Sequence, residues 1–264
     1  MIPKIIHYCW FGGNPKNKLF DKCFKSWKKY CPDYEIIEWN EENFDISSCP
    51  LYVRQAYDAK MWAFVTDYVR LKVVYDCGGI YLDTDVELKK KIDKLLEHSA
   101  YFGFEDGIHV ATGLGFGAVK GHLILKELME DYEGIPFILE NGEFDRTPCP
   151  TRNTSIFRRH GLKQKDEKQL LDDDILILPS IYLCPISYQT GSYHHSRKTI
   201  SVHWFSASWQ SENERELHKQ AEKRRKRESR KDFFLHMPNR IVRKVIGKER
   251  YEQLKKFIKK FFEK

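Results

Sequence analysis

Two aspartates one residue apart are the side chains in this sequence that most plainly could do chemistry. Asp83 and Asp85 follow the run Gly78-Gly79-Ile80-Tyr81-Leu82, a glycine break that leads into an apolar strand. Where the chain turns at a strand end, both carboxylates can converge on one cation, and Mg²⁺ or Mn²⁺ prefers such oxygens and keeps positions open for phosphate. Ligands also favour the carboxyl ends of strands in α/β sheets. We therefore interpret the pair as a metal site that grips a diphosphate, with a solvated acidic turn as the alternative.

A second pair of charged residues lies upstream, in a long helical pattern. Asp67 and Arg70 are three residues apart, so they share one face of the predicted helix. The planar guanidinium of Arg70 suits phosphate or sugar oxygens, and Asp67 could bind sugar hydroxyls. The alternative is an ion pair on the surface, which would stabilise the fold by only about a few tenths of a kcal/mol.

Two aromatic clusters stand near the ends of the predicted body. The late run from His203 to Trp209 contains Ser208 and could supply a metal ligand, phosphate contacts and a stacking surface, or it could simply edge the core. His7 and Trp10 end the first predicted strand, where an α/β sheet would receive a nucleotide base. The glycines that follow match neither a Walker loop nor G-x-G-x-x-G.

The order of the elements predicts an α/β sheet. The sequence indicates a strand over 2–10, a helix over 21–29 and a strand over 34–39, and this order implies a parallel pair. We expect one helix from about 53 to 75 and then one strand over 80–88 that carries both aspartates. Weaker patterns indicate further elements, which are a short helix over 92–96, strands over 101–104, 113–119, 176–179 and 201–204, and a helix over 123–132.

Composition separates a body from a basic tail. The 264 residues are 41% hydrophobic and 14% aromatic, which is enough for a sizeable core. The formal net charge is +7, but residues 212–264 carry +10 and residues 1–211 carry −3. We therefore expect one domain over 1–211 and a basic amphipathic helical tail over 212–264, which could pack on the body, dock on an anionic membrane surface or bind nucleic acid.

The cysteines and the apolar runs bear on the compartment. There are seven cysteines, an odd number, and none forms C-x-x-C, which argues against a disulfide framework or a zinc site and for a reducing cytosol. No run approaches 18 consecutive apolar residues, and the first residues do not have the pattern of a signal peptide. We expect a cytoplasmic protein at the inner face of the cell membrane.

Taken together, these strings resemble glycosyltransferase family 32 and its relatives with a sugar-binding region containing a DXD motif. The similarity is strong over residues 2–90, fair over 201–209 and patchy between them. It rests on a set of positions in the order and spacing of the family, which are 2–7, Trp10, Trp39-Asn40, Ala63, Asp67, Arg70, Tyr75, the run from Gly78 to Asp83, Asp85, His203 and Ser208-Trp209.

The resemblance implies a GT-A fold, in which helices flank a Rossmann-like mixed sheet, here followed by the C-terminal basic helical extension. It implies a retaining hexosyltransferase with a UDP- or GDP-sugar donor and Mn²⁺ or Mg²⁺. This compact chain resembles the bacterial enzymes of capsule and surface-polysaccharide biosynthesis more than the large toxin or Golgi members of the family. The implied roles by position are metal ligation by Asp83, Asp85 and His203, catalysis by Asp67, Arg70 and Asp85, and donor binding by His7, Trp10, Asp67, Arg70, Tyr81, Asp83, Ser208 and Trp209.

The acceptor is the least defined part of this expectation. No acceptor signature stands out between residues 113 and 154. We expect a glycan acceptor, on a lipid carrier if the tail contacts the membrane, and we expect no nucleic-acid partner because the body is slightly acidic. If the departing phosphate takes the proton of the incoming hydroxyl, no protein base is needed, and Glu105 and Asp106 would only line the pocket. The alternative function is a catalytically silent protein of the same fold that binds sugar nucleotides.

Overall fold

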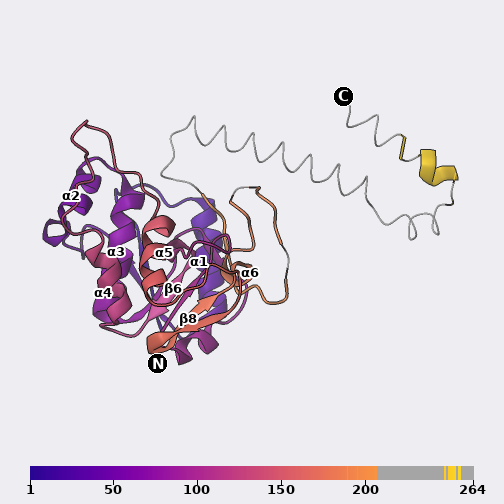
Figure 1. The fold of residues 1–264 in the computed structure, drawn as a ribbon, viewed down its shortest axis with the longest axis horizontal. Helices are drawn as coiled ribbons and strands as arrows, with labels where there is room; N and C mark the ends of the chain where they lie inside the picture. The colour runs from indigo at the N-terminus through magenta and orange to yellow at the C-terminus, as the bar shows by residue number, and fades with distance from the viewer. Residues whose placement is uncertain (189, 195, 207–246, 248, 254, 257–264) are drawn as a thin grey trace. The chain divides into compact units, whose positions relative to one another are not determined.

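The fold is built on a seven-stranded mixed sheet. The computed structural model describes residues 1–188, 190–194, 196–206, 247, 249–253 and 255–256 (Figure 1). The strands stand in the order β2-β1-β3-β6-β5-β8-β7. Their bounds are β1 Ile5–Cys9, β2 Glu35–Trp39, β3 Gly79–Tyr81, β5 Ala100–Gly103, β6 Phe116–Ala118, β7 Gln169–Leu171 and β8 Ile175–Leu178.

Both strand directions occur in this sheet. β1 is parallel to β2 and to β3, as the strand–helix–strand order predicted, and β5 is parallel to β8. β6 is antiparallel to β3 and β5, and β7 is antiparallel to β8. A second sheet pairs β4 (Val86–Leu88) with β9 (Ser201–His203) in antiparallel register.

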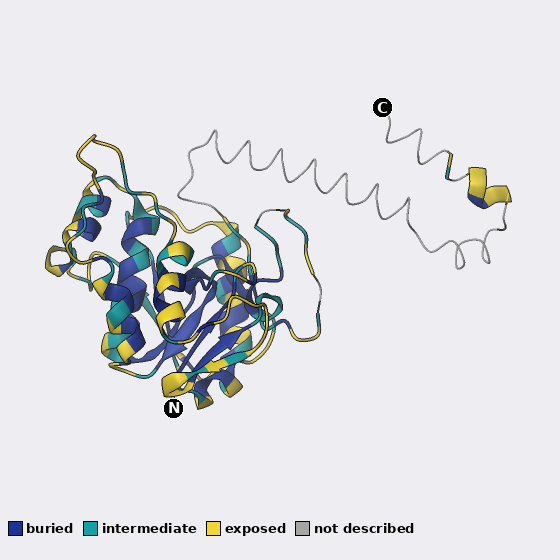
Figure 2. Cartoon of the chain, in the orientation of Figure 1, coloured by how far each residue is buried: buried dark blue, intermediate teal, exposed yellow. Residues whose placement is uncertain are grey.

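Helices cover both faces of the main sheet, and Figure 2 shows buried strands between exposed helix faces. One core lies between the sheet and α2 (Leu51–Asp58), α3 (Trp62–Cys77), α4 (Leu123–Glu130) and α5 (Cys149–Arg159). The other core joins the opposite face to α1 (Lys18–Tyr30), the β4–β9 sheet and α6 (Ser180–Leu183). Four short 3₁₀ helices complete the described elements, which are η1 Ile46–Ser48, η2 Asp93–Glu97, η3 Thr112–Leu114 and η4 Asp172–Asp174. The predicted α/β class, a mixed sheet flanked by helices, is confirmed.

The prediction of one helix from 53 to 75 was wrong, because the chain breaks after Asp58. Lys60 adopts φ +57°, in the left-handed region. The amide of Lys60 donates to the carbonyl of Tyr57, and the amide of Met61 donates to the carbonyl of Ala56. These two bonds form a Schellman motif, which ends α2 and redirects the chain into α3. Because lysine stands where glycine is usual, no local stop signal marks this end of the helix.

The predicted strand over 80–88 was also wrong as a single element. β3 ends at Tyr81, and the chain turns before β4 begins at Val86. Gly79 shows why the preceding break needs glycine. Its φ is +110°, and a Cβ there would lie 2.8 Å from the carbonyl oxygen of Ile5. β3 is thereby held tightly against β1, and the two aspartates fall in the turn between two different sheets.

The middle of the chain follows the predictions in part. The strand expected over 113–119 is divided into η3 and β6, and the helix expected over 92–96 is the 3₁₀ helix η2. Helix α5 was not predicted, because its first turn contains Pro150 and its residues are mostly weak helix formers.

The tail lies mostly outside the described residues. Residues up to 188 and the described part of 193–206 form one compact unit, whereas the expected boundary between 211 and 212 lies outside the described residues and stays a prediction. Among the described residues, no helix has both the length and the apolar character needed to cross a membrane.

Candidate functional site

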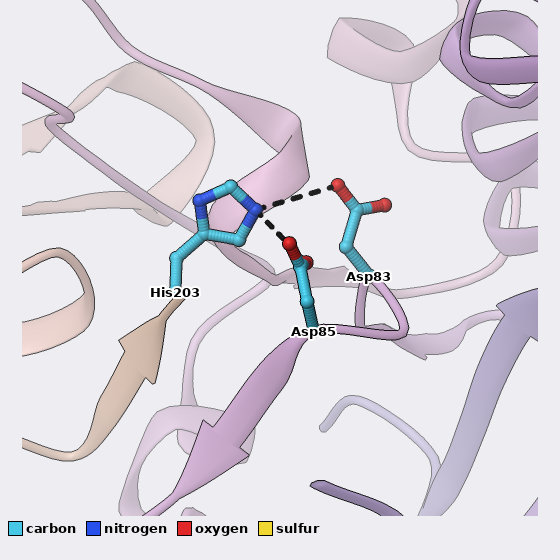
Figure 3. A group of neighbouring side chains, drawn as sticks. All are labelled: Asp83, Asp85 and His203. Carbon is cyan, nitrogen blue, oxygen red and sulfur yellow. Dashed lines mark ion pairs between the residues drawn. The ribbon is translucent and has the colours of Figure 1, made fainter. Parts of the chain in front are cut away.

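Three metal-ligating side chains from distant parts of the sequence converge at one place. Asp83 and Asp85 lie in the turn between β3 and β4, and His203 ends β9 (Figure 3). The Nε2 atom of His203 lies 3.1 Å from Oδ1 of Asp85 and 3.9 Å from Oδ2 of Asp83. One ligand atom from each residue lies within 4.8 Å of the other two. The structure thus brings together the three residues that the resemblance implied as metal ligands.

Pairing between β4 and β9 produces this convergence. Val86 stands opposite His203 in the antiparallel register. Beyond the strand, the amide of Trp204 donates to the carbonyl of Asp85 at 3.1 Å, and the amide of Ser206 donates to Oδ2 of Asp85 at 2.7 Å. The acidic turn and the late segment therefore hold each other in place.

The electrostatics of the cluster call for positive charge between the carboxylates. Burial alone would lower the pKa of His203, but Asp85 and Asp83 outweigh it and raise that pKa to about 9. Burial would raise the pKa of Asp85, yet His203 and the Ser206 amide hold it below its usual value. Burial is the larger effect at Asp83 and raises its pKa, against the attraction of Arg70. Two desolvated carboxylates thus lie near one histidine ring, and Asp85 is the one within hydrogen-bond distance of it.

This donor set fits a divalent cation. Carboxylate oxygens and a neutral imidazole are the ligands that Mn²⁺ accepts, and the carboxylates suit Mg²⁺. A cation must displace the proton of His203, because only neutral imidazole ligates. The Nδ1 atom of His203 is buried and has no hydrogen-bond partner among the described residues. Nε2 is the ring nitrogen that faces both carboxylates, so a metal held there would take the place of the His203 contact with Asp85.

Arg70 connects α3 to this cluster. Its side chain is 3% exposed, pairs with Asp67 one turn earlier and lies 3.4 Å from Oδ1 of Asp83. The surface ion pair considered as an alternative is therefore excluded for Asp67 and Arg70. One guanidinium binds both carboxylates, and this fixes the side chain of Asp83 relative to α3.

Gly113 leaves the space that Asp83 occupies. A Cβ at position 113 would lie 2.7 Å from Oδ2 of Asp83 and 3.3 Å from Nη1 of Arg70. Its neighbour Thr112 is buried and accepts a hydrogen bond from Nδ2 of Asn153 at 3.1 Å, which ties η3 to α5. Helix α5, which was not predicted, thus supports the segment that packs on the acidic turn.

Two hollows meet at the cluster. The tryptophan hollow, of about 340 Å³, is lined by Trp10, Trp62, Asn14 and Asn17 on one side. The arginine hollow, of about 350 Å³, is lined by residues of α3, of the loops around 105 and 113 and of the start of α5, with Arg70 at its wall. Residues that line both are Ala63, Thr66, Asp83, Tyr188, His203 and Phe205. Asp83 and His203 therefore stand where the two hollows meet, and Asp85 lines the tryptophan hollow beside them.

Glu105 is a carboxylate in the arginine hollow without a described hydrogen-bond partner. It follows β5, and no hydrogen bond or ion pair joins its side chain to another described residue. Burial raises the pKa of this carboxyl, and His203 opposes that rise. A desolvated carboxylate in a cleft is a candidate functional group.

The remaining expected site residues divide into three groups. Trp10 and Tyr81 line the tryptophan hollow, where Tyr81 is almost wholly buried. His7 does not reach it, because it is buried, bonds the carbonyl of Gly78 through Nε2 at 2.8 Å and accepts from Trp39 through Nδ1 at 3.0 Å. We therefore correct His7 from a donor-binding to a structural residue. Ser208 and Trp209 lie outside the described residues.

Several lining residues were not anticipated. Trp62 packs against Tyr57 at 5.3 Å between ring centroids, and Gly12 allows its close approach, since a Cβ there would lie 2.5 Å from the Trp62 ring. Tyr188 and Phe205 pack together at 5.1 Å between both hollows. A tryptophan at the start of a helix was the one available signal for Trp62, whereas nothing local distinguishes Tyr188.

Sequence comparison places this geometry in a known context. Residues 17–102 match the family described as "Glycosyltransferase sugar-binding region containing DXD motif". The chain is 31% identical over 144 residues to inositol phosphoceramide mannosyltransferase 3 of Schizosaccharomyces pombe, covering 52% of this chain and 38% of that protein. It is 27% identical over 148 residues to mannosyl phosphorylinositol ceramide synthase SUR1 of Saccharomyces cerevisiae, covering 52% of this chain and 37% of that protein. The chain thus spans less than two-fifths of the length of these relatives.

Solved structures show weaker likeness. A PaToxG glycosyltransferase has a TM-score of 0.43 at 17% identity, over 60% of this chain and 68% of that one. A glycosyltransferase involved in the glycosylation of the major capsid of PBCV-1 also has a TM-score of 0.43, at 14% identity, over 82% of this chain and 98% of that one. Since these scores are below 0.5, the similarity to glycosyltransferases rests on the sequence match. Residues 17–102 are thus similar to the DXD-containing glycosyltransferases, as the sequence predicted, and the bacterial capsular type stays a prediction.

Proposed function

We propose that the protein is a metal-dependent glycosyltransferase that moves a hexose from a nucleoside diphosphate sugar to an acceptor hydroxyl. The observation that carries this proposal is the meeting of Asp83, Asp85 and His203 at the junction of two hollows. When bound there, a divalent cation would neutralise negative charge on the departing diphosphate. The match to the DXD region supports the assignment independently of this geometry.

The two hollows suit the two ends of a sugar nucleotide. The tryptophan hollow offers the indole rings of Trp10 and Trp62 as surfaces for a base, and Trp10 is fixed by a bond from Nε1 to the carbonyl of Asn14 at 2.7 Å. The arginine hollow offers Asp67 and Arg70 for the sugar and the sugar-side phosphate. The diphosphate would lie between them, beside the candidate metal ligands.

The proposed reaction needs few groups from the protein. A new bond forms between the acceptor oxygen and the anomeric carbon, and the bond from that carbon to the phosphate oxygen breaks. In the retaining course that we propose, the hydroxyl proton passes to the departing phosphate oxygen. Arg70 would contribute positive charge near that oxygen, and Asp67 and Asp83 would hold the guanidinium in place. Glu105 would orient the incoming hydroxyl as a hydrogen-bond acceptor.

The finer specificity remains part of the proposal. We propose a UDP- or GDP-hexose, and the names of the yeast relatives favour a mannosyl donor and a lipid acceptor of the inositol phosphoceramide type. Surface polysaccharide or capsule synthesis is the alternative that the sequence predicted. A lipid-borne acceptor agrees with a peripheral position at the cytoplasmic face of a membrane, which we keep as a proposal, as we do the membrane role of the tail.

Thermal unfolding with a panel of nucleotide sugars tests the function. A ligand at about 100 times its Kd stabilises the native state by about 2.7 kcal/mol, so the cognate donor with Mn²⁺ should raise the Tm by several degrees. Slow release of free sugar should accompany that shift, and EDTA should abolish both. Stabilisation without sugar release or transfer would instead support the silent binding protein. Transfer that persists in EDTA would contradict the metal role.

A further inference from the structure

A concentrated basic face lies outside the hollows. We define the basic face as the lysines of α1 together with the basic residues of 89–94 and 197–198. The segments 18–29, 89–94 and 197–198 hold eleven lysines and arginines and only two aspartates, a net charge of +9. Since residues 1–211 total −3, the rest of that stretch carries −12. Charge within the body is therefore strongly segregated.

Packing brings the three segments side by side. Nε1 of Trp27 on α1 donates to the carbonyl of Val86 at 2.7 Å, and Oγ of Ser26 accepts from the amide of Leu88 at 2.9 Å. Residues 89–94 leave β4 directly beside α1. Nζ of Lys90 donates to the carbonyl of Arg197 and joins the third segment. The charges thus share one face although they lie up to 180 positions apart in the sequence.

Most of these lysines have no acidic partner. Lys18, Lys22, Lys25 and Lys29 recur at spacings of four, three and four, so they form one exposed stripe along α1. Within the described part of the chain, only Lys22 and Lys89 of the ten lysines of the face pair with a carboxylate, and both use Glu87. Like charges at these spacings destabilise a helix, so the stripe works against the stability of α1 and is suited to an anionic partner.

An exposed tryptophan links this face to the functional site. Trp204 is 37% exposed, and Nζ of Lys22 lies 4.0 Å from the centroid of its ring. Its Nε1 donates to Glu87 at 3.0 Å, and its backbone amide donates to the carbonyl of Asp85. The edge of the basic face is therefore one residue from His203.

We infer that the basic face docks α1 on an anionic lipid bilayer, with Trp204 at the level of the headgroups. Exposed lysines are attracted to anionic lipids additively, and indole rings favour the membrane interface. Ten of the eleven basic residues are lysines and one is arginine, and the face lacks the aromatic interleaving typical of single-strand binding. The choice of a lipid over a nucleic acid as the partner rests partly on the proposed function, because a lipid-borne acceptor would lie beside the site.

Vesicle flotation with the full chain tests the inference. The variant Lys18→Gln/Lys25→Gln/Lys28→Gln/Lys29→Gln keeps good helix formers and touches no described ion pair. At about 1 kcal/mol per lysine, its partition onto phosphatidylserine-containing vesicles should fall by about 100-fold or more. The variant Lys120→Gln/Lys163→Gln/Lys165→Gln/Lys168→Gln makes the same charge change at exposed positions elsewhere and should bind as wild type does.

Three other outcomes would overturn the inference, and a fourth would contradict only the proposed function. Equal binding of both variants would show that another part of the chain docks. Equal loss in both would reveal a dependence on net charge alone. Binding to duplex DNA but not to vesicles would assign the face to nucleic acid. If wild type and Asp85→Asn bind vesicles equally but wild type never turns over a nucleotide sugar, the face stands and the proposed function fails.

Discussion

At the scale of single residues, Arg70 joins two carboxylates that would otherwise repel each other. Replacing it with methionine leaves Asp67 and Asp83 without their shared cation, and removing one partner of a buried pair costs about 3 kcal/mol or more. Urea unfolding should therefore show a marked loss of stability for Arg70→Met. The control is Lys72→Met on the same helix, which breaks only the exposed pair with Asp76 and should cost about 1 kcal/mol or less. Equal losses of stability in the two variants would contradict the role of Arg70 as the buried partner of both carboxylates.

Glu105 should have opposite effects on stability and on transfer. Because burial raises its pKa, its ionised form weakens the folded state, and Glu105→Gln should raise the free energy of unfolding. The native Glu105 carboxyl binds a proton more tightly than the unfolded one does. The difference in free energy of unfolding between variant and wild type is therefore largest above the native pKa, and it shrinks as the pH falls through that pKa. Urea unfolding of both proteins across pH measures this; a gain that is independent of pH would contradict the assignment.

The same variant should lower transfer more than donor hydrolysis. If Glu105 orients the acceptor hydroxyl, transfer should fall by about 10-fold or more, the range of one lost hydrogen bond to a charged group. Release of free sugar to water, which uses the donor site alone, should change little. Parallel loss of both activities would place Glu105 in donor binding.

At the scale of elements, the break between α2 and α3 positions the site helix. Lys60 is exposed and holds a left-handed conformation that costs a residue with a Cβ about 1 kcal/mol. Lys60→Gly should stabilise the protein by about that amount, because glycine adopts this conformation without the clash. Lys72→Gly, inside α3, should destabilise it by about 1 kcal/mol. Two losses of similar size in thermal unfolding would refute the Schellman assignment.

The elements that the sequence predicted are those with a local signal. The first strand, its helix and the parallel second strand follow from periodicity and turn residues, and Gly78-Gly79 marked the end of α3. The break between α2 and α3 could not be predicted, because lysine stands in place of the usual glycine. Helix α5 could not be predicted either, because its residues are mostly weak helix formers. The split of 80–88 depended on β9, a partner from the far end of the body.

At the scale of the whole molecule, the site is a product of tertiary structure. Asp83 and Asp85 could be recognised from their spacing, and His203 from the aromatic cluster around it. Their convergence needed the β4–β9 pair, and the depth of the hollows needed Gly12, Gly113 and α5, which carry no chemistry of their own. His7 shows the converse, since a residue of suitable chemistry at the right strand was taken up by the core.

The most direct test of this account is Mn²⁺ binding in the presence of UDP or GDP, measured by titration calorimetry. The wild-type chain should bind one equivalent of Mn²⁺, and Asp85→Asn and His203→Ala should each weaken that binding by at least about 10-fold, since both remove a ligand from one centre. Asp172→Asn, at an exposed position on η4 that lines neither hollow, should leave it unchanged. Mn²⁺ binding that is the same in all four proteins would contradict the proposal that these side chains, 120 positions apart, hold one cation.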